Sequence, residues 1–424
     1  MIQSLSNILA GAAGETPPDQ AIDRILEAVR THLGMDIAFA SRFVDGRREF
    51  THVNSDGPAP AKPGDSEPQE DTYCWRILQG RLPELIVDAG DHPEAADLPI
   101  TAAMPVGSHL NVPLRLSDGS VYGSFCCLSH RPDRTLTPRD LDTMRAFAAL
   151  AVEQIESELG DEADRREQVA RITHLIEQDR LAMVYQPIHR LADGRPIGVE
   201  ALARFPDQAE RTPDRWFAEA ARIGLGTELE MLAVRQAIRG LPFIPAELYV
   251  AVNVSPTTAM SAELEKVVVA APQGRLVVEV TEHSKVADYE ALCAALARLR
   301  TRARIAIDDV GAGYSGLRRI LDLRPDILKL DMSLTRDVDS DPARSALARA
   351  LVTFAQGIGC QIVAEGIETE AEMKALRAFG VGYGQGWHFS RPMPSVAVQQ
   401  FLLGAGVQAE TAPSQTAAEA RRRA

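Results

Sequence analysis

The feature that most constrains the fold is a series of eight short β-rich runs in the second half of the chain. They lie at residues 182–188, 197–203, 248–253, 276–281, 304–308, 327–330, 361–364 and 382–386. From the second run onward, helical segments generally separate them. Eight strands that alternate with helices are typical of a (β/α)8 barrel. We therefore expect an α/β barrel in this half.

The first two runs depart from that pattern. Only a short link containing Ala192-Asp193-Gly194 joins them, and it is too short for the helical crossover that parallel strands require. An antiparallel hairpin fits so short a connection. The sequence therefore predicts a modified TIM (β/α)8 barrel whose first two strands are antiparallel.

Polar side chains stand at the ends of seven of these runs. In chain order they are Glu200, Asn253, Glu279, Asp308 with Asp309, Lys329, Glu365 and Gln385. Taken singly, each residue also fits a purely structural role, because polar residues commonly end strands and cap helices. The carboxyl ends of barrel strands form one rim, however, and several carboxylates at one rim repel one another unless a cation offsets them. The set therefore indicates a metal site.

The ligand type narrows the choice of metal. Oxygen ligands suit Mg²⁺ or Mn²⁺, and the absence of a histidine pair or cysteine cluster in the sequence argues against zinc there. Two such ions, about 3.5–4 Å apart, are the usual device for in-line attack of water on a phosphodiester. The residues therefore predict a metal-dependent phosphodiesterase.

The charge of the chain limits its partners. Its 424 residues include 45 basic and 59 acidic side chains, a formal net charge of −14. Such a charge disfavours polymeric nucleic acid and anionic membranes, although bound metal can reverse the local sign for a small phosphate ester. Neither a run of ~18 apolar residues nor a basic leader before the first apolar residues is present, so we expect a cytoplasmic protein.

The cysteines give no sign of a disulfide framework or a zinc knuckle. There are five, at irregular spacing: Cys74, Cys126, Cys127, Cys293 and Cys360. An odd number in this arrangement favours reduced thiols.

The first half has a different pattern, with a helix at 21–33, a strand at 37–43, a Pro- and Gly-rich loop at 57–68 and strands at 110–114 and 121–128. A further helix is predicted to begin at Thr137-Pro138. Its apolar stripe, the charged stretch 161–168 and a second stripe form a helical joint. This joint resembles connectors that pair across a dimer and carry a signal, and a solvated spacer helix fits it equally well.

Eight motifs in order support a family resemblance for residues 175–403. They are Tyr185-Gln186-Pro187, Gly198-Val199-Glu200-Ala201-Leu202-Ala203-Arg204, Val252-Asn253-Val254-Ser255, Glu279-Val280-Thr281-Glu282, Asp308-Asp309-Val310-Gly311-Ala312-Gly313-Tyr314-Ser315, Leu328-Lys329-Leu330-Asp331, Ala364-Glu365-Gly366-Ile367-Glu368 and Gln385-Gly386. This segment resembles the EAL family of cyclic di-GMP phosphodiesterases. The resemblance implies an EAL-type barrel that hydrolyses cyclic di-GMP to linear pGpG.

The resemblance also implies residue roles. The first metal ion would be held by Glu200, Asn253, Glu279 and Asp308, and Asp308 with Asp309 would reach the second. Lys329 would orient the attacking water, and Glu365 resembles the general base or a ligand acting through water. Glu282 would anchor the loop after Asp309. The dinucleotide site would be lined by Gln186, Leu202, Arg204 and Gln385.

In the segment that follows Asp309, two positions depart from the family pattern. Val310 stands where the family commonly has Phe, and Gly316 where it commonly has Ser. Both changes loosen the loop that would set the second metal ion. They leave open a catalytically weak or inactive receptor for cyclic di-GMP, and a barrel acting on another phosphodiester is a third alternative.

Residues 17–158 resemble a GAF sensory domain, an α+β fold, on the motifs Asp71-Thr72-Tyr73-Cys74, Asn111-Val112-Pro113-Leu114 and Tyr122-Gly123-Ser124-Phe125-Cys126-Cys127. A linker at 159–174 and a disordered tail at 404–424 complete the expected organisation. Such a sensor would regulate turnover through a small ligand that the sequence does not identify. Cys74 is a chromophore anchor or, more simply, a buried thiol. By resemblance to EAL relatives we expect a homodimer.

Overall fold

The computed structural model describes residues 19–103, 105–206, 211–281, 288–310 and 317–411. The chain divides into two compact units, Met1–Asp164 and Arg165–Ala424. Helix α6 (Pro138–Glu177) runs through the boundary between them. The charged joint expected near residues 161–168 is therefore part of one continuous helix.

The N-terminal unit is built on a six-stranded antiparallel sheet of order β3-β2-β1-β6-β5-β4. The strands are β1 (Ile37–Val44), β2 (Arg47–Ser55), β3 (Ser66–Pro68), β4 (Leu85–Ile86), β5 (Ser108–Arg115) and β6 (Val121–Ser129). Strands β1, β5 and β6 lie where the sequence predicts them. Strand β2 was not predicted, because its residues are mostly polar and its few apolar side chains are only partly buried.

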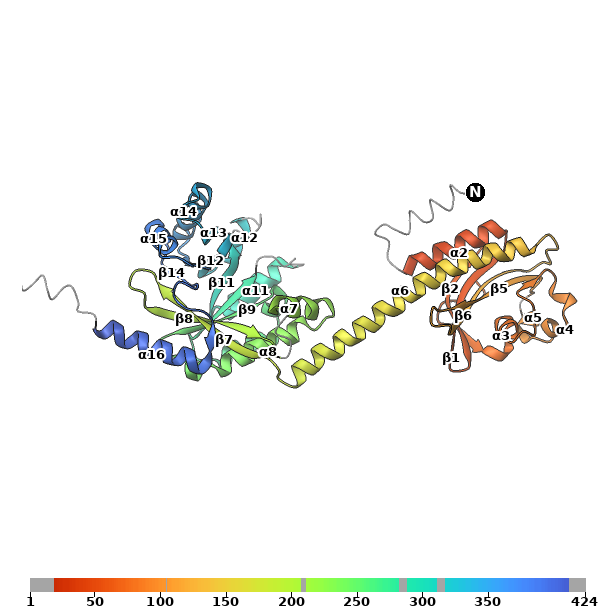
Figure 1. The fold of residues 1–424 in the computed structure, drawn as a ribbon, viewed down its shortest axis with the longest axis horizontal. Helices are drawn as coiled ribbons and strands as arrows, with labels where there is room; N and C mark the ends of the chain where they lie inside the picture. The colour runs from red at the N-terminus through yellow and green to blue at the C-terminus, as the bar shows by residue number, and fades with distance from the viewer. Residues whose placement is uncertain (1–18, 104, 207–210, 282–287, 311–316, 412–424) are drawn as a thin grey trace, which may run out of the picture. The chain divides into compact units, whose positions relative to one another are not determined.

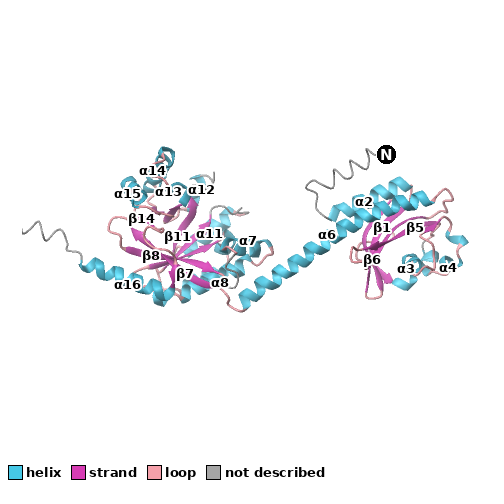
Figure 2. Cartoon of the chain, in the orientation of Figure 1, coloured by secondary structure: helices cyan, strands magenta, loops and turns pink. Residues whose placement is uncertain are grey.

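Helices cover one face of this sheet. Figures 1 and 2 show α2 (Asp19–Leu33) and the first part of α6 side by side against the strands. Residues such as Leu26 and Met144 on these helices pack against Phe125 and Cys127 of β6. The helix stripes and the alternation along the strands thus form one hydrophobic core.

The opposite face carries the short helices. They are α3 (Tyr73–Leu78), α4 (Pro93–Ala96) and α5 (Pro99–Ala103), with 3-10 turns η1 (Gln69–Asp71) and η2 (Ala89–Asp91). Cys74 of α3 packs with Phe39 of β1 and Cys126 of β6 on this side. The two sides of the sheet therefore have separate cores.

The C-terminal unit is a closed barrel of eight strands. They are β7 (Ala182–Arg190), β8 (Pro196–Arg204), β9 (Tyr249–Val254), β10 (Leu276–Thr281), β11 (Arg304–Val310), β12 (Ile327–Leu330), β13 (Gln361–Ala364) and β14 (Tyr383–Gly384). Strands β8 to β14 pair in parallel, and β14 pairs back to β7, which closes the sheet. The pairing of β7 with β8 is antiparallel. The modified barrel predicted from the sequence is confirmed.

Helices surround this barrel (Figure 2). Between β8 and β14 they are α7 (Pro213–Arg222), α8 (Gly226–Arg239), η4 (Leu241–Phe243), α9 (Pro256–Ala259), α10 (Ala262–Ala270), α11 (Tyr289–Leu299), α12 (Leu317–Leu323), α13 (Met332–Thr335), α14 (Pro342–Gly357) and α15 (Glu370–Phe379). A short strand, β15 (Met393–Pro394), adds to β7. Among the described helices, none is long and apolar enough to cross a membrane.

The last helix, α16 (Ser395–Thr411), continues past the boundary predicted at residue 403. Residues 404–411 are therefore helical, although the sequence predicts that they belong to a disordered tail. Residues 412–424 lie outside the described part of the chain.

Candidate active site

The ammonium group of Lys329 lies among four carboxylates inside the barrel. Its Nζ is 2.6 Å from Glu365 Oε1 and 2.7 Å from Glu279 Oε2. It is 3.3 Å from both Glu200 Oε1 and Asp308 Oδ1. The Lys329 side chain is only 1% exposed. When ionised, the four carboxyl groups exceed the one positive charge of Lys329, and a divalent cation can offset the excess negative charge.

Strand register brings these side chains together. Glu279 of β10 pairs with Asn253 of β9, and Thr281 pairs with Asp308 of β11. Lys329 lies on β12, beside β11. Glu200 and Glu279 are interior to their strands, since β8 continues to Arg204 and β10 to Thr281. These two carboxylates therefore lie deeper in the barrel than the strand ends, where the sequence predicts them.

Two amides hold the carboxylates in place. Asn253 Nδ2 donates to Glu200 Oε1 at 2.7 Å. Gln385 Nε2 donates to Glu200 Oε2 at 2.5 Å and to Glu365 Oε1 at 3.1 Å. Gln385, which the sequence assigns to substrate binding, thus contacts the carboxylate cluster directly.

The donor set fits a hard cation. Oxygen atoms of Glu200, Asp308 and Glu365 lie within 4.8 Å of one another. Within the described residues, the buried Oδ1 of Asn253 and Oε1 of Gln385 accept no hydrogen bond. Buried acceptors without partners are costly and uncommon. An ion that accepts oxygen ligands would satisfy them, so the residues present suit Mg²⁺ or Mn²⁺.

Burial and crowding shift the protonation of the cluster. Burial raises the pKa of Glu279 and of Glu365 well above the ordinary value, against the attraction of Lys329. Although burial opposes the charge of Lys329, the surrounding carboxylates raise its pKa well above the ordinary value. Burial also opposes ionisation of Glu200, but Lys329 and the two amides lower its pKa. Lys329 is therefore a cation here, able to donate hydrogen bonds.

The other predicted substrate residues extend outward along the hairpin. Gln186 pairs with Glu200 across β7 and β8, and its Nε2 donates to Ser390 O at 3.1 Å. Leu202 and Arg204 follow Glu200 at alternate positions, which places all three on one face of β8. Glu200 is buried, Leu202 half-buried and Arg204 exposed. The face therefore leads from the carboxylates to solvent.

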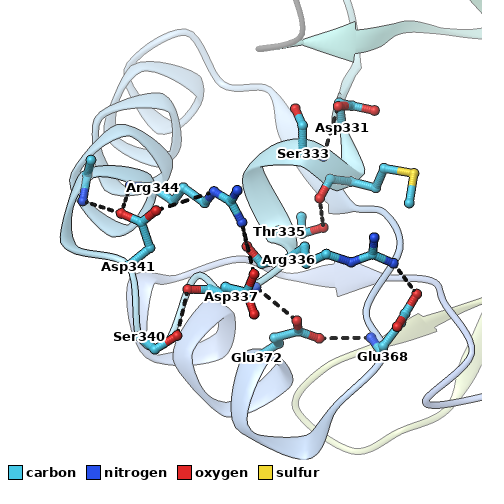
Figure 3. Close-up of polar contacts among 12 residues, drawn as sticks. Asp331, Ser333, Thr335, Arg336, Asp337, Ser340, Asp341, Arg344, Glu368 and Glu372 are labelled. Atoms are coloured by element: carbon cyan, nitrogen blue, oxygen red, sulfur yellow. Dashed lines mark hydrogen bonds and ion pairs between the residues drawn. The ribbon is translucent and has the colours of Figure 1, made fainter.

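A polar network supports the segment that carries Glu365. Thr335 Oγ1 donates to the backbone oxygen of Glu365. The buried carboxylate of Glu372 accepts from the backbone N–H of Asp337, Glu368 and Thr369 at 2.9–3.0 Å. Figure 3 shows Glu372 between Asp337 and Glu368. Sequence reasoning missed this network, because only the capping pattern of Thr369 and Glu372 hints at it.

The structure does not describe some of the residues predicted from the sequence. Glu282, Gly311, Gly313 and Gly316 lie outside the described residues, and the side chain of Asp309 is not described. Val310 is 3% exposed and belongs to the barrel core.

The two units together define an α+β domain followed by an α/β barrel with a carboxylate-rich centre. The chain belongs to the EAL domain family, whose family model matches residues 169–392, more than half of the chain. A GAF domain model matches residues 17–155. Both resemblances inferred from the sequence motifs are confirmed.

Curated relatives are named for cyclic di-GMP. The chain is 34% identical over 240 residues to the cyclic di-GMP phosphodiesterase NbdA of Pseudomonas aeruginosa, covering 54% of this chain and 31% of that protein. It is 30% identical over 238 residues to the probable cyclic di-GMP phosphodiesterase PdeD of Escherichia coli, covering 54% and 44%. The chain thus spans less than half the length of these relatives.

Solved structures share the fold. The PaMucR phosphodiesterase in complex with c-di-GMP is 28% identical, with a TM-score of 0.50 over 55% of this chain and 99% of that one. The EAL enzyme Bd1971, bound to cAMP and cyclic di-GMP, aligns with 87% of this chain and 93% of its own, with a TM-score of 0.53 and 17% identity. The second likeness concerns the fold alone.

Proposed function

We propose that this chain is a metal-dependent phosphodiesterase that hydrolyses cyclic di-GMP to linear pGpG. The observation that carries the proposal is the contact of Lys329 with Glu200, Glu279, Asp308 and Glu365 in one buried cluster. A buried lysine with only a structural role would need a single carboxylate to balance its charge. Four carboxylates around it form an anionic site suited to divalent metal.

The metal ligands are proposed to be Glu200, Asn253, Glu279, Asp308 and Asp309. The closeness of Glu365 to Glu200 and Asp308 supports its action as a ligand or through water at the same site. Bound Mg²⁺ or Mn²⁺ would polarise the phosphoryl oxygen and offset the charge that develops on it. Glu282 is proposed to anchor the loop that follows Asp309.

The chain's own residues then orient the reactants. Lys329 donates N–H bonds that position water, and Glu365, beside it, accepts the proton that the water loses. The water oxygen bonds to phosphorus while the bond from phosphorus to the 3′ ribose oxygen breaks. That ribose oxygen takes up a proton, and the 5′ side keeps the phosphate of pGpG.

The substrate is proposed to lie along the exposed end of the β7–β8 hairpin. The face that carries Leu202 and Arg204 leads outward from Glu200, and Gln186 stands opposite. A guanidinium matches phosphate oxygens in shape and charge. Gln385 is proposed to reach the substrate while it holds Glu200 and Glu365.

Turnover by the purified full chain tests this proposal. With cyclic di-GMP and Mg²⁺ or Mn²⁺, we expect linear pGpG by chromatography, and none above background from Glu200→Ala. A wild-type chain that forms no more product than Glu200→Ala would refute it. A panel of other cyclic and linear dinucleotides would identify a different phosphodiester as the preferred substrate.

A receptor that binds cyclic di-GMP without cleaving it is the second candidate. Val310, which replaces the commoner Phe next to Asp309, favours it, because a smaller side chain leaves the following loop less supported. Tight binding with Ca²⁺ and no turnover with Mg²⁺ or Mn²⁺ would identify the receptor.

Regulation by the N-terminal domain forms part of the proposal, with residues 17–158 as sensor, 159–174 as linker and 175–403 as barrel. We also propose a homodimer and a cytoplasmic location. Comparing product formation with and without residues 1–160 measures the regulatory effect, and light scattering measures the oligomeric state.

A further inference from the structure

A second group of metal-ligand side chains lies in the N-terminal unit. Cys74, His109 and Cys126 are each at most 1% exposed, and one ligand atom from each lies within 4.8 Å of the others. The two Sγ atoms are 3.2 Å apart. The phosphodiesterase chemistry proposed for the barrel uses none of these residues.

Strand register explains the grouping. On the antiparallel pair β5–β6, Asn111 lies opposite Cys126, and His109 lies opposite Leu128. These side chains therefore share one face of the sheet. Helix α3 places Cys74 on the same face, where it packs with Cys126. Cys127, one residue further along β6, packs in the core on the other face.

A hydrogen-bond donor lies beside each of the two sulfurs. Arg48 Nη1 lies 3.0 Å from Cys74 Sγ, and Asn111 Nδ2 lies 3.0 Å from Cys126 Sγ. A nearby guanidinium stabilises a thiolate, and the thiolate is the form that binds metal. Arg48 also pairs with Glu67, so two thiolates and one divalent ion would leave the local charge balanced.

The imidazole of His109 lies beside the two sulfurs and has one nitrogen without a hydrogen-bond partner in the described part of the chain. Among the residues that the structure describes, His109 Nδ1 and Asn111 Oδ1 are buried without a hydrogen-bond partner. An unsatisfied buried polar atom carries a free-energy cost and calls for an explanation such as an unseen ion. An ion held between the two buried sulfurs and the imidazole would supply such an explanation.

The His109 side of the group borders a cavity that neither Cys74 nor Cys126 lines. His109 and Arg48 line a cavity of about 220 Å³, together with Phe39, Phe50, Thr72 and Tyr73. Two sulfurs and one nitrogen complete three positions of a tetrahedral site, and a water molecule can take the fourth.

We propose that Cys74, His109 and Cys126 bind one zinc-class divalent metal ion in the N-terminal unit. The two thiolates and one imidazole are borderline-soft ligands, which favour Zn²⁺ over the Mg²⁺ or Mn²⁺ suited to the oxygen ligands of the barrel. Asn111 and Arg48 act as positioning residues, because they donate to the ligand sulfurs. The inference is independent of the activity proposed for the barrel.

A disulfide between Cys74 and Cys126 is the competing chemistry. Their Sγ separation of 3.2 Å exceeds the ~2.0 Å of a disulfide bond. Forming that bond would release two protons and two electrons to an oxidant, and it would leave His109 without a role. The imidazole beside the two sulfurs therefore favours the metal.

Metal analysis of the full-length chain tests the inference. The protein is purified under reducing conditions, loaded with Zn²⁺ or Co²⁺ in excess Mg²⁺ and desalted. We expect one retained Zn²⁺ per chain and, with Co²⁺, the thiolate-to-cobalt absorption that an all-oxygen site cannot produce. Cys74→Ser and Cys126→Ser should abolish that absorption, and His109→Gln should change the ligand-field bands. Asn111→Ala should weaken zinc binding roughly 10–100-fold.

Cys127→Ser is the matched control, since it removes the adjacent buried thiol from the opposite face and should keep the full cobalt spectrum. A wild-type chain without the thiolate band, or a band unchanged in Cys74→Ser and Cys126→Ser, would overturn the proposal. So would a stable mass loss of two hydrogens with no bound metal, which indicates a disulfide. The wild-type spectrum can overturn the proposal by itself, so the test remains decisive even if one of the variants fails to fold.

Discussion

Nζ of Lys329 lies 2.6 Å from Oε1 of Glu365, although the two residues belong to successive strand-to-helix segments of the barrel. Lys329 is interior to β12 and Glu365 follows β13. The pairing of Leu330 with Ala364 aligns the two strands so that these side chains meet. The contact joins the proposed water-orienting cation to the proposed proton acceptor.

Replacing Lys329 should reduce the rate more than the affinity. Lys329→Ala removes the hydrogen-bond donor that positions water, so kcat should fall roughly 10²–10³-fold. The Kd for cyclic di-GMP in Ca²⁺ should change far less, because the predicted substrate contacts are untouched. Lys329→Met, which keeps the side-chain length, should behave alike. Equal losses of rate and affinity would contradict the assigned role.

Asn253→Ala should weaken metal binding. The change removes an unpartnered acceptor oxygen and the hydrogen bond that orients Glu200. The Mn²⁺ concentration for half-maximal turnover should rise roughly 10–100-fold. Asn54→Ala in β2 of the other unit is the control and should leave the Mn²⁺ dependence unchanged. An unaltered metal requirement in Asn253→Ala would remove Asn253 from the ligand set.

Val310→Phe tests whether the loop after β11 limits turnover. We expect a higher basal rate, because a larger side chain supports the start of that loop. Val310 is buried in the barrel core, so the added volume should also lower the free energy of unfolding by about 1–3 kcal/mol. Measuring kcat and urea unfolding together separates the two effects. A basal rate equal to that of the wild type would dismiss the loop as the limiting feature.

Glu372 should stabilise the barrel in a pH-dependent way. Burial opposes its ionisation, but bonds from the backbone N–H of Asp337, Glu368 and Thr369 lower its pKa. A carboxyl group whose pKa is lower in the folded protein stabilises the folded state at pH values above its ordinary pKa of 4.5. This contribution is lost as the pH falls through the folded pKa.

Glu372→Gln should therefore lower the free energy of unfolding by roughly 1–3 kcal/mol at pH 7. In acid, the difference in the free energy of unfolding between Glu372→Gln and the wild type should narrow, because the wild-type carboxylate becomes protonated. Glu370→Gln, on the same helix, is the matched control. Glu370 forms an exposed ion pair with Lys374, so this change should have little effect. A gap that widens in acid would contradict the assignment.

Much of the barrel could be predicted from local patterns. The apolar runs that form β7–β14 are short and bounded by turn residues. Strands of that kind can be recognised from their local sequence alone. The link around Asp193 was too short for a crossover, which determined that β7 and β8 are antiparallel. Strand β2 escaped prediction because Phe50 and Val53 are its main apolar residues, too few to give a clear alternation.

The sequence by itself determined the order of the strands, the polar residues near their ends and the family to which they point. Only the tertiary structure placed Lys329 among four carboxylates and set Gln385 against Glu200 and Glu365. It also brought Cys74 beside His109 and Cys126, three residues whose spacing along the chain resembles no metal motif. The physical reason is that distances between side chains far apart in sequence depend on strand register and barrel closure, which the packing of the whole fold decides.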